Sequence, residues 1–242
     1  MANIDQAMIM AAGMGKRMLP LTENLPKPMI EIRGKTLITH ILEKLYFEGI
    51  KKIVINVHYL SELIIQHVKS LPFYHDIEVI FSHEDELLES GGGIVKALPF
   101  FNNKPFYRIN SDIYWEDESL LYYINKNWEN NNCDALLLAI EKNKFFGYDG
   151  KGDFDIISDK YVKILANELA YAFSGIGVFC PKLFEKLEIK KFTLFGDFIF
   201  KEKKNSENIL HNINALKYEN RIFHIGTVEN LKEADKLLKL EF

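Results

Sequence analysis

The sequence predicts an α/β protein built on a mainly parallel β-sheet flanked by helices, and three observations support this class. Short runs rich in β-branched and aromatic residues alternate with amphipathic stretches through about the first 140 residues, as they do in βαβ units. Of the 242 residues, 48% are hydrophobic and 26% are charged, which suits a sizeable core that needs neither disulfides nor a structural metal. After residue 141 the rhythm changes, because glycines interrupt a polar stretch before shorter strands follow.

The expected elements follow from the apolar periodicity and from the residues that bound each run. Strands are expected at Ala7–Ala11, Lys52–Val57, Ile77–Phe81, Pro105–Ile109 and Ala135–Ile140, and then, in antiparallel arrangement, at Tyr161–Ile164 and Ala170–Phe179. Helices are expected at Thr36–Phe47, Ser61–Lys69, Glu116–Trp128, Leu194–Lys203 and Val228–Leu240. Thr36 and Ser61 stand where helix N-caps belong, and Gly49 stands where the first helix should stop.

Composition and charge exclude several classes of protein. The two cysteines, Cys133 and Cys180, lie far apart with no zinc-binding spacing, so the sequence predicts neither a disulfide framework nor a zinc site. No apolar run reaches the roughly 18 residues of a membrane span, and the N-terminus lacks the pattern of a signal peptide. A formal net charge of −4 argues against non-specific nucleic-acid binding. A cytoplasmic protein that binds neither membrane nor nucleic acid is expected.

A glycine turn surrounded by cations is the most informative segment of the sequence. It lies in residues 10–29, MAAGMGKRMLPLTENLPKPM, and begins where the first strand should end, which is where open α/β sheets bind ligands. Gly13 and Gly15 allow a tight turn with accessible N–H groups, and the cations Lys16, Arg17 and Lys27 are directed at that turn. The spacing fits neither a P-loop nor a dinucleotide-binding motif. The segment therefore predicts an oxyanion site.

The signature AAGxGxRxxPLT…PKPM in residues 11–29 resembles that of the sugar-1-phosphate nucleotidyltransferases, and the resemblance extends over nearly the whole chain. It implies a Rossmann-like, GT-A-type mixed sheet with a small antiparallel sugar-binding lobe. It also implies one domain over residues 1–242, with no appended domain. Residues 1–140 would form the nucleotide-binding core, 141–227 the sugar-binding lobe and the return to the core, and 228–242 the C-terminal helix.

The resemblance also implies roles for individual residues. The nucleotide would be bound by Ala11, Ala12, Gly13, Gly15, Lys16, Arg17 and Lys27, together with Glu89, Gly91 and Gly92 of the loop Leu88–Ile94, which faces the base and opens a helix. Asn110, Asp153 and Ser174 would bind the sugar phosphate, and Arg17, Lys27 and Asp112 would carry catalysis. Asp112 would hold Mg²⁺, with Mn²⁺ as an alternative.

Two departures from the family pattern concern the metal and the sugar. Many relatives carry an aspartate two residues before the late Gly-Thr pair, and this chain has His224 there. Because Mg²⁺ prefers oxygen ligands, His224 makes that second metal position an open question. The Glu-Lys-Pro motif that often follows the strand expected at Tyr161–Ile164 is also absent, and Glu168 is the nearest replacement.

The implied reaction joins a nucleoside triphosphate and a sugar 1-phosphate, with release of pyrophosphate. Within the family, the segments LESGGGI, GKGDF, FSGI and GTxE are similar to those of N-acetylmuramate-1-phosphate uridylyltransferases, which favours UTP and N-acetylmuramate 1-phosphate as substrates. Mannose-1-phosphate guanylyltransferase and phosphocholine cytidylyltransferase activities stay open. So do a GT-A glycosyltransferase and a non-catalytic subunit that binds a sugar nucleotide. A monomer or a small homo-oligomer is expected.

Overall fold

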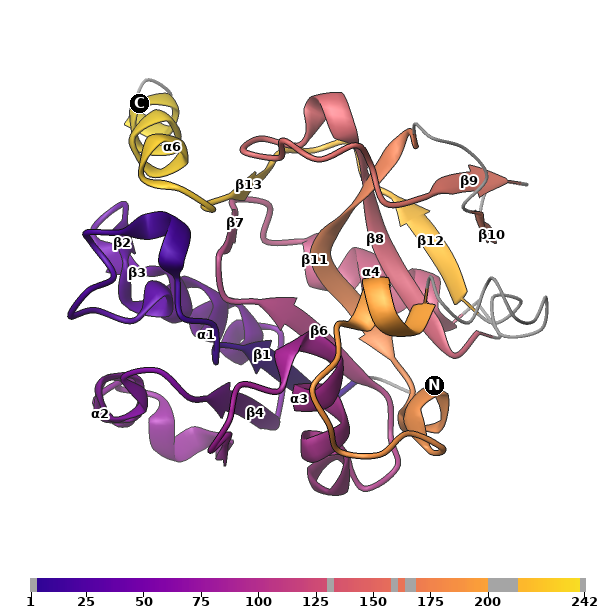
Figure 1. The fold of residues 1–242 in the computed structure, drawn as a ribbon, viewed down its shortest axis with the longest axis horizontal. Coiled ribbons are helices and arrows are strands. Elements are labelled where there is room, and N and C mark those ends of the chain that lie inside the picture. The colour runs from indigo at the N-terminus through magenta and orange to yellow at the C-terminus, as the bar shows by residue number, and fades with distance from the viewer. Residues whose placement is uncertain (1–3, 130–132, 158–160, 164–168, 200–212, 240–242) are drawn as a thin grey trace.

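The computed structural model describes residues 4–129, 133–157, 161–163, 169–199 and 213–239, and a nine-stranded sheet forms its centre (Figure 1). The strand order is β5-β4-β1-β6-β11-β8-β12-β10-β9. In chain order, these strands are β1 (Gln6–Met10), β4 (Lys52–Val57), β5 (Glu78–His83), β6 (Phe106–Asn110), β8 (Ala135–Glu141), β9 (Asp155–Ile157), β10 (Tyr161–Lys163), β11 (Tyr171–Phe179) and β12 (Ile213–Lys217).

The sheet is mixed, and most of its strands run in one direction. Strands β5, β4, β1 and β6 pair in parallel, and β12 pairs in parallel with β8. Strand β11 runs antiparallel to both of its neighbours, β6 and β8. At the far edge, β10 pairs antiparallel with β12 and with β9. The mixed, mainly parallel sheet expected from the sequence is therefore confirmed.

Helices cover both faces of the sheet, as the alternation of side chains along the strands requires. On one face, Ala7 and Ile9 of β1 pack with the apolar sides of α1 (Leu37–Phe47), α2 (Ser61–Lys69) and α4 (Leu120–Glu129). On the other face, Met8 packs with α3 (Glu89–Ala97) and with the helical turn Leu194–Ile199. The polar residues at the carboxyl ends of the strands lie outside these two cores.

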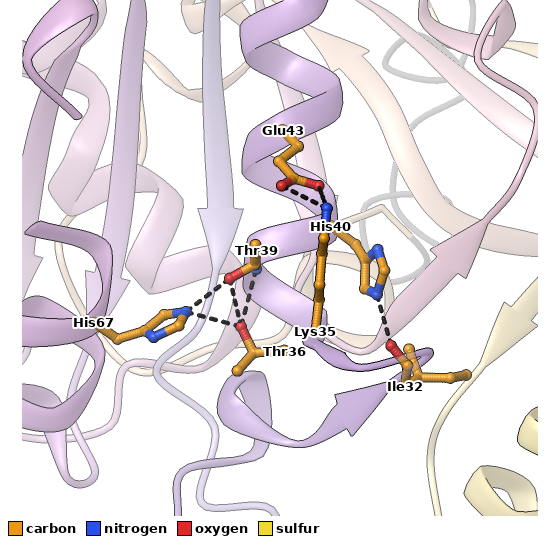
Figure 2. A network of polar contacts seen from close by, with 7 residues as sticks. All are labelled: Ile32, Lys35, Thr36, Thr39, His40, Glu43 and His67. Carbon is orange, nitrogen blue, oxygen red and sulfur yellow. Dashed lines mark hydrogen bonds and ion pairs between the residues drawn. The ribbon is translucent and has the colours of Figure 1, made fainter. Parts of the chain in front are cut away.

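The start of α1 is held by a polar network that also involves α2 (Figure 2). The Oγ1 of Thr36 accepts a hydrogen bond from the N–H of Thr39 at 3.2 Å, so the N-cap predicted for Thr36 is confirmed. His67 of α2 lies 2.9 Å from the Thr36 hydroxyl and 2.7 Å from that of Thr39. Burial lowers the pKa of His67. The network joins two helices that flank the parallel half of the sheet.

The last helix packs against the N-terminal part of the chain. Helix α6 (Val228–Lys239) lies beside the small hairpin of β2 (Glu31–Ile32) and β3 (Lys35–Thr36) in Figure 1. Its Ala234 and Leu238 share an apolar cluster with Met18, which belongs to the glycine turn. The same cluster contains residues of the pair β7 (Ile113–Trp115) and β13 (Ile222–His224). The C-terminal helix therefore helps to hold the segment after β1 in place.

The predicted strands begin and end within two residues of the observed ones, and the larger differences concern helices. Leu60, not Ser61, occupies the N-cap of α2, so the cap predicted for Ser61 is wrong. Helix α4 begins at Leu120 rather than Glu116, because Asp117 binds the N–H of Ser119 in a turn that precedes the helix. The helix predicted at residues 194–203 is a π-helical turn over Leu194–Ile199, and residues 200–203 lie outside the described part of the chain, as do Ile164 and Glu168.

The division of the chain into core, lobe and C-terminal helix stays a prediction, as does the oligomeric state. Within the described ranges, no helix is long and apolar enough to span a bilayer.

Candidate active site

The glycine turn after β1 brings a lysine toward the carboxyl end of the sheet. Gly15 has a φ of +64°, a conformation that glycine adopts without strain. A Cβ atom on Gly15 would lie 2.9 Å from Thr22 Cγ2 and 3.1 Å from Lys27 Cβ. The Thr22 hydroxyl donates to the Gly15 carbonyl at 2.8 Å, which closes the turn. A glycine is therefore required for this close approach, and the approach places Lys27 beside the turn.

Lys27 meets Asp112, the residue that follows β6 and precedes β7. The Lys27 Nζ lies 2.5 Å from Asp112 Oδ2, and the two side chains are only 12% and 19% exposed. Although burial disfavours a charged carboxylate, Lys27 and His224 together hold the pKa of Asp112 well below its ordinary value. Asp112 is therefore an anion throughout the neutral range.

His224 reaches the same carboxylate from the end of the chain. Strand β13 pairs antiparallel with β7, and this register places His224 opposite Ile113, the neighbour of Asp112. The His224 Nε2 lies 3.4 Å from Asp112 Oδ2, and Nδ1 lies 3.2 Å from the Gly147 carbonyl. Since that carbonyl can only accept, Nδ1 is the protonated nitrogen of this contact. The other nitrogen, Nε2, faces Asp112.

Arg17 borders the same group through Gly226. A Cβ atom on Gly226 would lie 2.9 Å from His224 Cε1 and 3.4 Å from Arg17 Nη2. Gly226 is thus enclosed by the cation of the glycine turn and by the imidazole ring. Arg17, Lys27, Asp112 and His224, which lie far apart in the sequence, are brought together at the carboxyl ends of β1 and β6.

A cavity of about 590 Å³ opens above these residues. Its walls include most of the predicted nucleotide and catalytic residues, namely Gly13, Gly15, Lys16, Arg17, Lys27, Glu89 and Asp112, and also Asn110, which is predicted to bind the sugar phosphate. Three lysine or arginine side chains of the glycine segment thereby face one concave space, which the mild net negative charge of the chain does not reveal. Such a cavity can hold a polyanion and neutralise charge that develops on it.

Ala11 and Ala12 do not line this cavity. Both are buried, and the Ala11 N–H donates to Asn56 Oδ1 at 2.8 Å. These two alanines support the turn from below, and the nucleotide contacts predicted for them stay predictions.

Gly91 and Gly92 pack against another segment of the same chain. The Gly91 N–H donates to the Phe192 carbonyl at 2.9 Å. A Cβ on Gly91 would overlap the Phe192 ring at 2.2 Å, and a Cβ on Gly92 would overlap the Lys190 carbonyl oxygen at 2.1 Å. These glycines admit the segment 190–192 of the same chain, and the nucleotide contacts predicted for them stay predictions. Of the predicted base-facing residues, Glu89 is the one that lines the cavity.

The polar groups of Asp153 and Ser174 are engaged within the protein. Asp153 Oδ2 accepts the N–H of Phe173 at 2.8 Å, and burial raises the pKa of Asp153. Ser174 is fully buried, and its Oγ accepts the N–H of Ile176 at 3.2 Å, inside an irregularity of β11. Neither residue lines the main cavity. Among the residues predicted to bind the sugar phosphate, Asn110 is the one exposed to this space.

Two polar residues of the cavity were not predicted, Ser111 and Lys191. Ser111 lies between Asn110 and Asp112 and could have been inferred from that motif. Lys191 comes from the segment that packs on α3, where the Phe192 N–H donates to the Leu88 carbonyl at 3.1 Å. No local pattern in the sequence marks this lysine, because its position depends on a contact between distant segments.

Asp112 and His224 offer two ligand atoms for a divalent cation. Asp112 Oδ1 is buried and has no hydrogen-bond partner among the described residues, which leaves one carboxylate oxygen for a further ligand. His224 offers Nε2 next to it, with Nδ1 held by a backbone carbonyl, as in many metal-binding histidines. No group of three or more acidic, histidine or cysteine residues that could hold a metal occurs among the described residues. The pair fits a cation that takes its remaining ligands from elsewhere, and the predicted Mg²⁺ stays a prediction.

Comparison with known proteins assigns the class. The family described as nucleotidyl transferase matches residues 6–234, nearly the whole chain, and the protein belongs to this family. The N-acetylmuramate alpha-1-phosphate uridylyltransferase of Neisseria meningitidis is 30% identical over 234 residues, which cover 96% of this chain and 97% of that protein.

More distant relatives agree with this class. A mannose-1-phosphate guanylyltransferase catalytic subunit beta of Drosophila melanogaster is 27% identical over 196 residues, covering 78% of this chain and 52% of that protein. The crystal structure of HddC from Yersinia pseudotuberculosis complexed with GMP-PN superposes with a TM-score of 0.78. It is 25% identical and covers 97% of this chain and all of that one. The chain is thus a nucleotidyltransferase, and the family predicted from the glycine signature is confirmed.

Proposed function

We propose that this nucleotidyltransferase joins UTP to N-acetylmuramate 1-phosphate, giving a UDP-sugar and pyrophosphate. The observation that carries the proposal is the similarity to the Neisseria meningitidis uridylyltransferase, which spans almost the full length of both chains. The cavity at the ends of β1 and β6 supports it, because its cations suit two phosphorylated substrates.

The reaction places few demands on acid–base chemistry. A phosphate oxygen of the sugar 1-phosphate attacks the α-phosphorus of the triphosphate, a new P–O bond forms, and the bond to the β-phosphate oxygen breaks. The nucleophile is already anionic near neutral pH, so no side chain needs to remove a proton. Catalysis then consists of holding two polyanions in line and neutralising charge at the transferred group.

The residues at the cavity divide this task. The turn over Gly13 and Gly15 directs backbone N–H groups toward the phosphates, and Lys16 and Arg17 follow it directly. Lys27, held by Asp112, supplies a cation at the α-phosphate. Asp112 and His224 would hold a divalent cation, which when bound supplies further positive charge to the phosphate oxygens.

Guanine is the alternative base. The fly relative is named a guanylyltransferase, and the HddC structure was determined with GMP-PN. Both relatives have a lower sequence identity to this chain than the muramate enzyme has. The match to the fly relative also covers only 52% of that protein. UTP is therefore the substrate proposed here.

A substrate panel tests the proposal. The purified protein is incubated with each of the four nucleoside triphosphates and with several sugar 1-phosphates, and pyrophosphate is measured with Mg²⁺ or Mn²⁺ present. The highest kcat/KM is expected for UTP with N-acetylmuramate 1-phosphate. A higher value for GTP with a mannose phosphate would replace the proposed substrates, and no pyrophosphate with any pair would favour a non-catalytic sugar-nucleotide-binding subunit.

A further inference from the structure

A buried arginine lies beneath the cavity and has no role in the chemistry described so far. Arg108 stands in the middle of β6, on the face that carries Met8 and Phe106 toward the second apolar core. Arg108 is 4% exposed. Burial lowers its pKa to about 10, and the charge of Asp112 acts in the opposite direction. The guanidinium is therefore still a cation at neutral pH, inside the protein.

This cation is under-satisfied by its own chain. Its Nη1 donates one long hydrogen bond, 3.4 Å, to the Gly175 carbonyl, and its Nε is buried with no partner in the described part of the chain. The guanidinium carbon lies 5.4 Å from the centre of the Phe173 ring. Within the residues that the structure describes, no carboxylate lies at ion-pair distance from Arg108. A buried arginine is ordinarily paired with an anion, so a carboxylate bound here would compensate a charge that the described residues leave without a direct ion pair.

The two nearby carboxylates make their close contacts with other groups. Asp153, which contacts the same strand β11, has its oxygens engaged by the Phe173 N–H and the Tyr148 hydroxyl. Asp112 acts on Arg108 through its charge, but its ion-pair contacts are with Lys27 and His224. Neither carboxylate therefore forms a direct ion pair with Arg108.

Arg108 is not itself part of the cavity wall, but it stands on β6, the strand that supplies a residue of that wall. Asn110, which lines the cavity, lies two residues further along the same face of β6, about 6.6 Å away by strand geometry. Gly175 joins the two residues: its carbonyl accepts from Arg108, and a Cβ on it would lie 2.8 Å from Asn110 Nδ2. Gly175 has a φ of +88° in the irregular part of β11, so the strand is bent where it meets both side chains.

We propose that Arg108 determines sugar specificity by binding a carboxylate carried on the sugar ring, so that the enzyme prefers an acidic sugar 1-phosphate to its neutral counterpart. The inference rests on the proposed function, since it assigns a substrate feature to the same cavity. The phosphates of both substrates are served by Arg17 and Lys27 at the glycine turn. Arg108 lies instead against Phe173 and Gly175, away from that turn.

The guanidinium geometry suits a carboxylate. A guanidinium can donate two parallel N–H bonds to one carboxyl group, and such charge-assisted bonds are stronger than bonds between neutral groups. A carboxylate in the cavity would reach the guanidinium past Asn110, the wall residue that stands two positions further along β6. A neutral hydroxyl would leave the buried charge uncompensated, which is the physical basis of the preference.

The first test uses the wild-type protein with two forms of one sugar. N-acetylmuramate 1-phosphate and its carboxyl methyl ester differ in the negative charge at the acid. The kcat/KM for the acid is expected to exceed that for the ester by about 10- to 100-fold, with the same nucleoside triphosphate. Equal values for acid and ester would overturn the proposal, whereas no turnover of any sugar 1-phosphate would instead refute the proposed function.

The second test replaces the arginine. Arg108→Met is expected to lower kcat/KM for N-acetylmuramate 1-phosphate about 10- to 100-fold and to change that for N-acetylglucosamine 1-phosphate less than threefold. Arg108→Lys is expected to retain part of the preference, because it keeps the charge and loses the paired donors. Arg221→Met, at an exposed arginine, serves as the matched control and should change neither value.

A structural role for Arg108 would give a different result. If the residue only supports the bend of β11, Arg108→Met would lower kcat/KM equally for the acidic and the neutral sugar 1-phosphate, and the proposal would be wrong. Thermal unfolding of the variants accompanies the kinetics. If Arg108→Met does not fold, the acid–ester comparison on the wild-type enzyme still decides.

Discussion

Replacing Lys27 by methionine removes the cation that pairs with Asp112 and keeps the length of the side chain. At 2.5 Å and an effective dielectric constant of about 20, the gross attraction between the two charges is about 7 kcal/mol. Desolvation of both groups offsets much of this attraction. Breaking a pair that is only 12% and 19% exposed leaves a nearly buried carboxylate, which is expected to lower the free energy of unfolding by about 3–5 kcal/mol.

The same substitution should slow turnover for a separate reason. Loss of a cation directed at a transferred phosphoryl group costs on the order of 10²–10³ in kcat, equivalent to about 2.7–4 kcal/mol of barrier. The measurement is pyrophosphate release at saturating triphosphate and sugar 1-phosphate. Urea unfolding at neutral pH gives the stability of the same samples.

A second substitution separates the two effects. In Lys27→Met/Asp112→Asn, the buried charge is gone, so most of the lost stability should return while turnover stays low. Lys35→Met is the matched control: Lys35 pairs with Glu43 at 2.7 Å but is 50% exposed, so about 0–1 kcal/mol and no activity should be lost. Wild-type turnover in Lys27→Met, or recovery of turnover in the double variant, would refute the role given to Lys27.

Three further predictions concern the same site. Gly15→Ala should lower the free energy of unfolding by about 1–3 kcal/mol and also slow turnover, because the methyl group would press on Lys27. Gly34 has a similar φ and open space around it, so Gly34→Ala should lower the free energy of unfolding by about 1 kcal/mol and leave turnover unchanged. Equal turnover in the two variants would contradict the geometry. His224→Asp should lower the Mg²⁺ concentration for half-maximal turnover about tenfold, and a loss of activity would show that the imidazole has its own role. Because the pKa of Asp112 is lower in the folded protein than in the unfolded chain, its ionised form stabilises the fold fully above about pH 4, and this stabilisation is lost as the pH falls further. The free energy of unfolding of Asp112→Asn should therefore fall less in acid than that of the wild type. Identical acid profiles would contradict the pKa shift.

Local patterns in the sequence predict the first half of the fold well. Lys52–Val57 is a strand with the bounds expected from its continuous apolar run, because strands of a parallel sheet are buried on both faces. The sequence predicts a glycine turn with Lys27 directed at it, and in the structure Gly15 lies against both Thr22 and Lys27. Such features are local, so sequence spacing is sufficient to predict them.

Contacts between distant segments account for what could not be predicted. Strands β7 and β13 are three residues long, too short to give a periodic pattern, yet their pairing places His224 beside Asp112. The sequence marked His224 as a departure from the family but could not place it. Asp153 and Ser174 were expected at the sugar, and the structure shows hydrogen bonds that hold β11.

The glycines of α3 show how one pattern can have two physical causes. A glycine triplet permits close approach of any group, and sequence alone does not tell a ligand from another part of the chain. Phe192 and the Lys190 carbonyl occupy the space beside Gly91 and Gly92. Arg108 presents the converse case: nothing in a strand-forming run indicates that its one charged residue is buried without an anion.

The most direct test of the proposed function is pyrophosphate release from UTP and N-acetylmuramate 1-phosphate by the wild-type protein, with Lys27→Met measured beside it. The proposal predicts rapid, sugar-dependent release by the wild type, slower release with other triphosphates, and a loss of about 10²–10³ in the variant. Release that does not depend on the sugar, or that is unchanged in Lys27→Met, would contradict it.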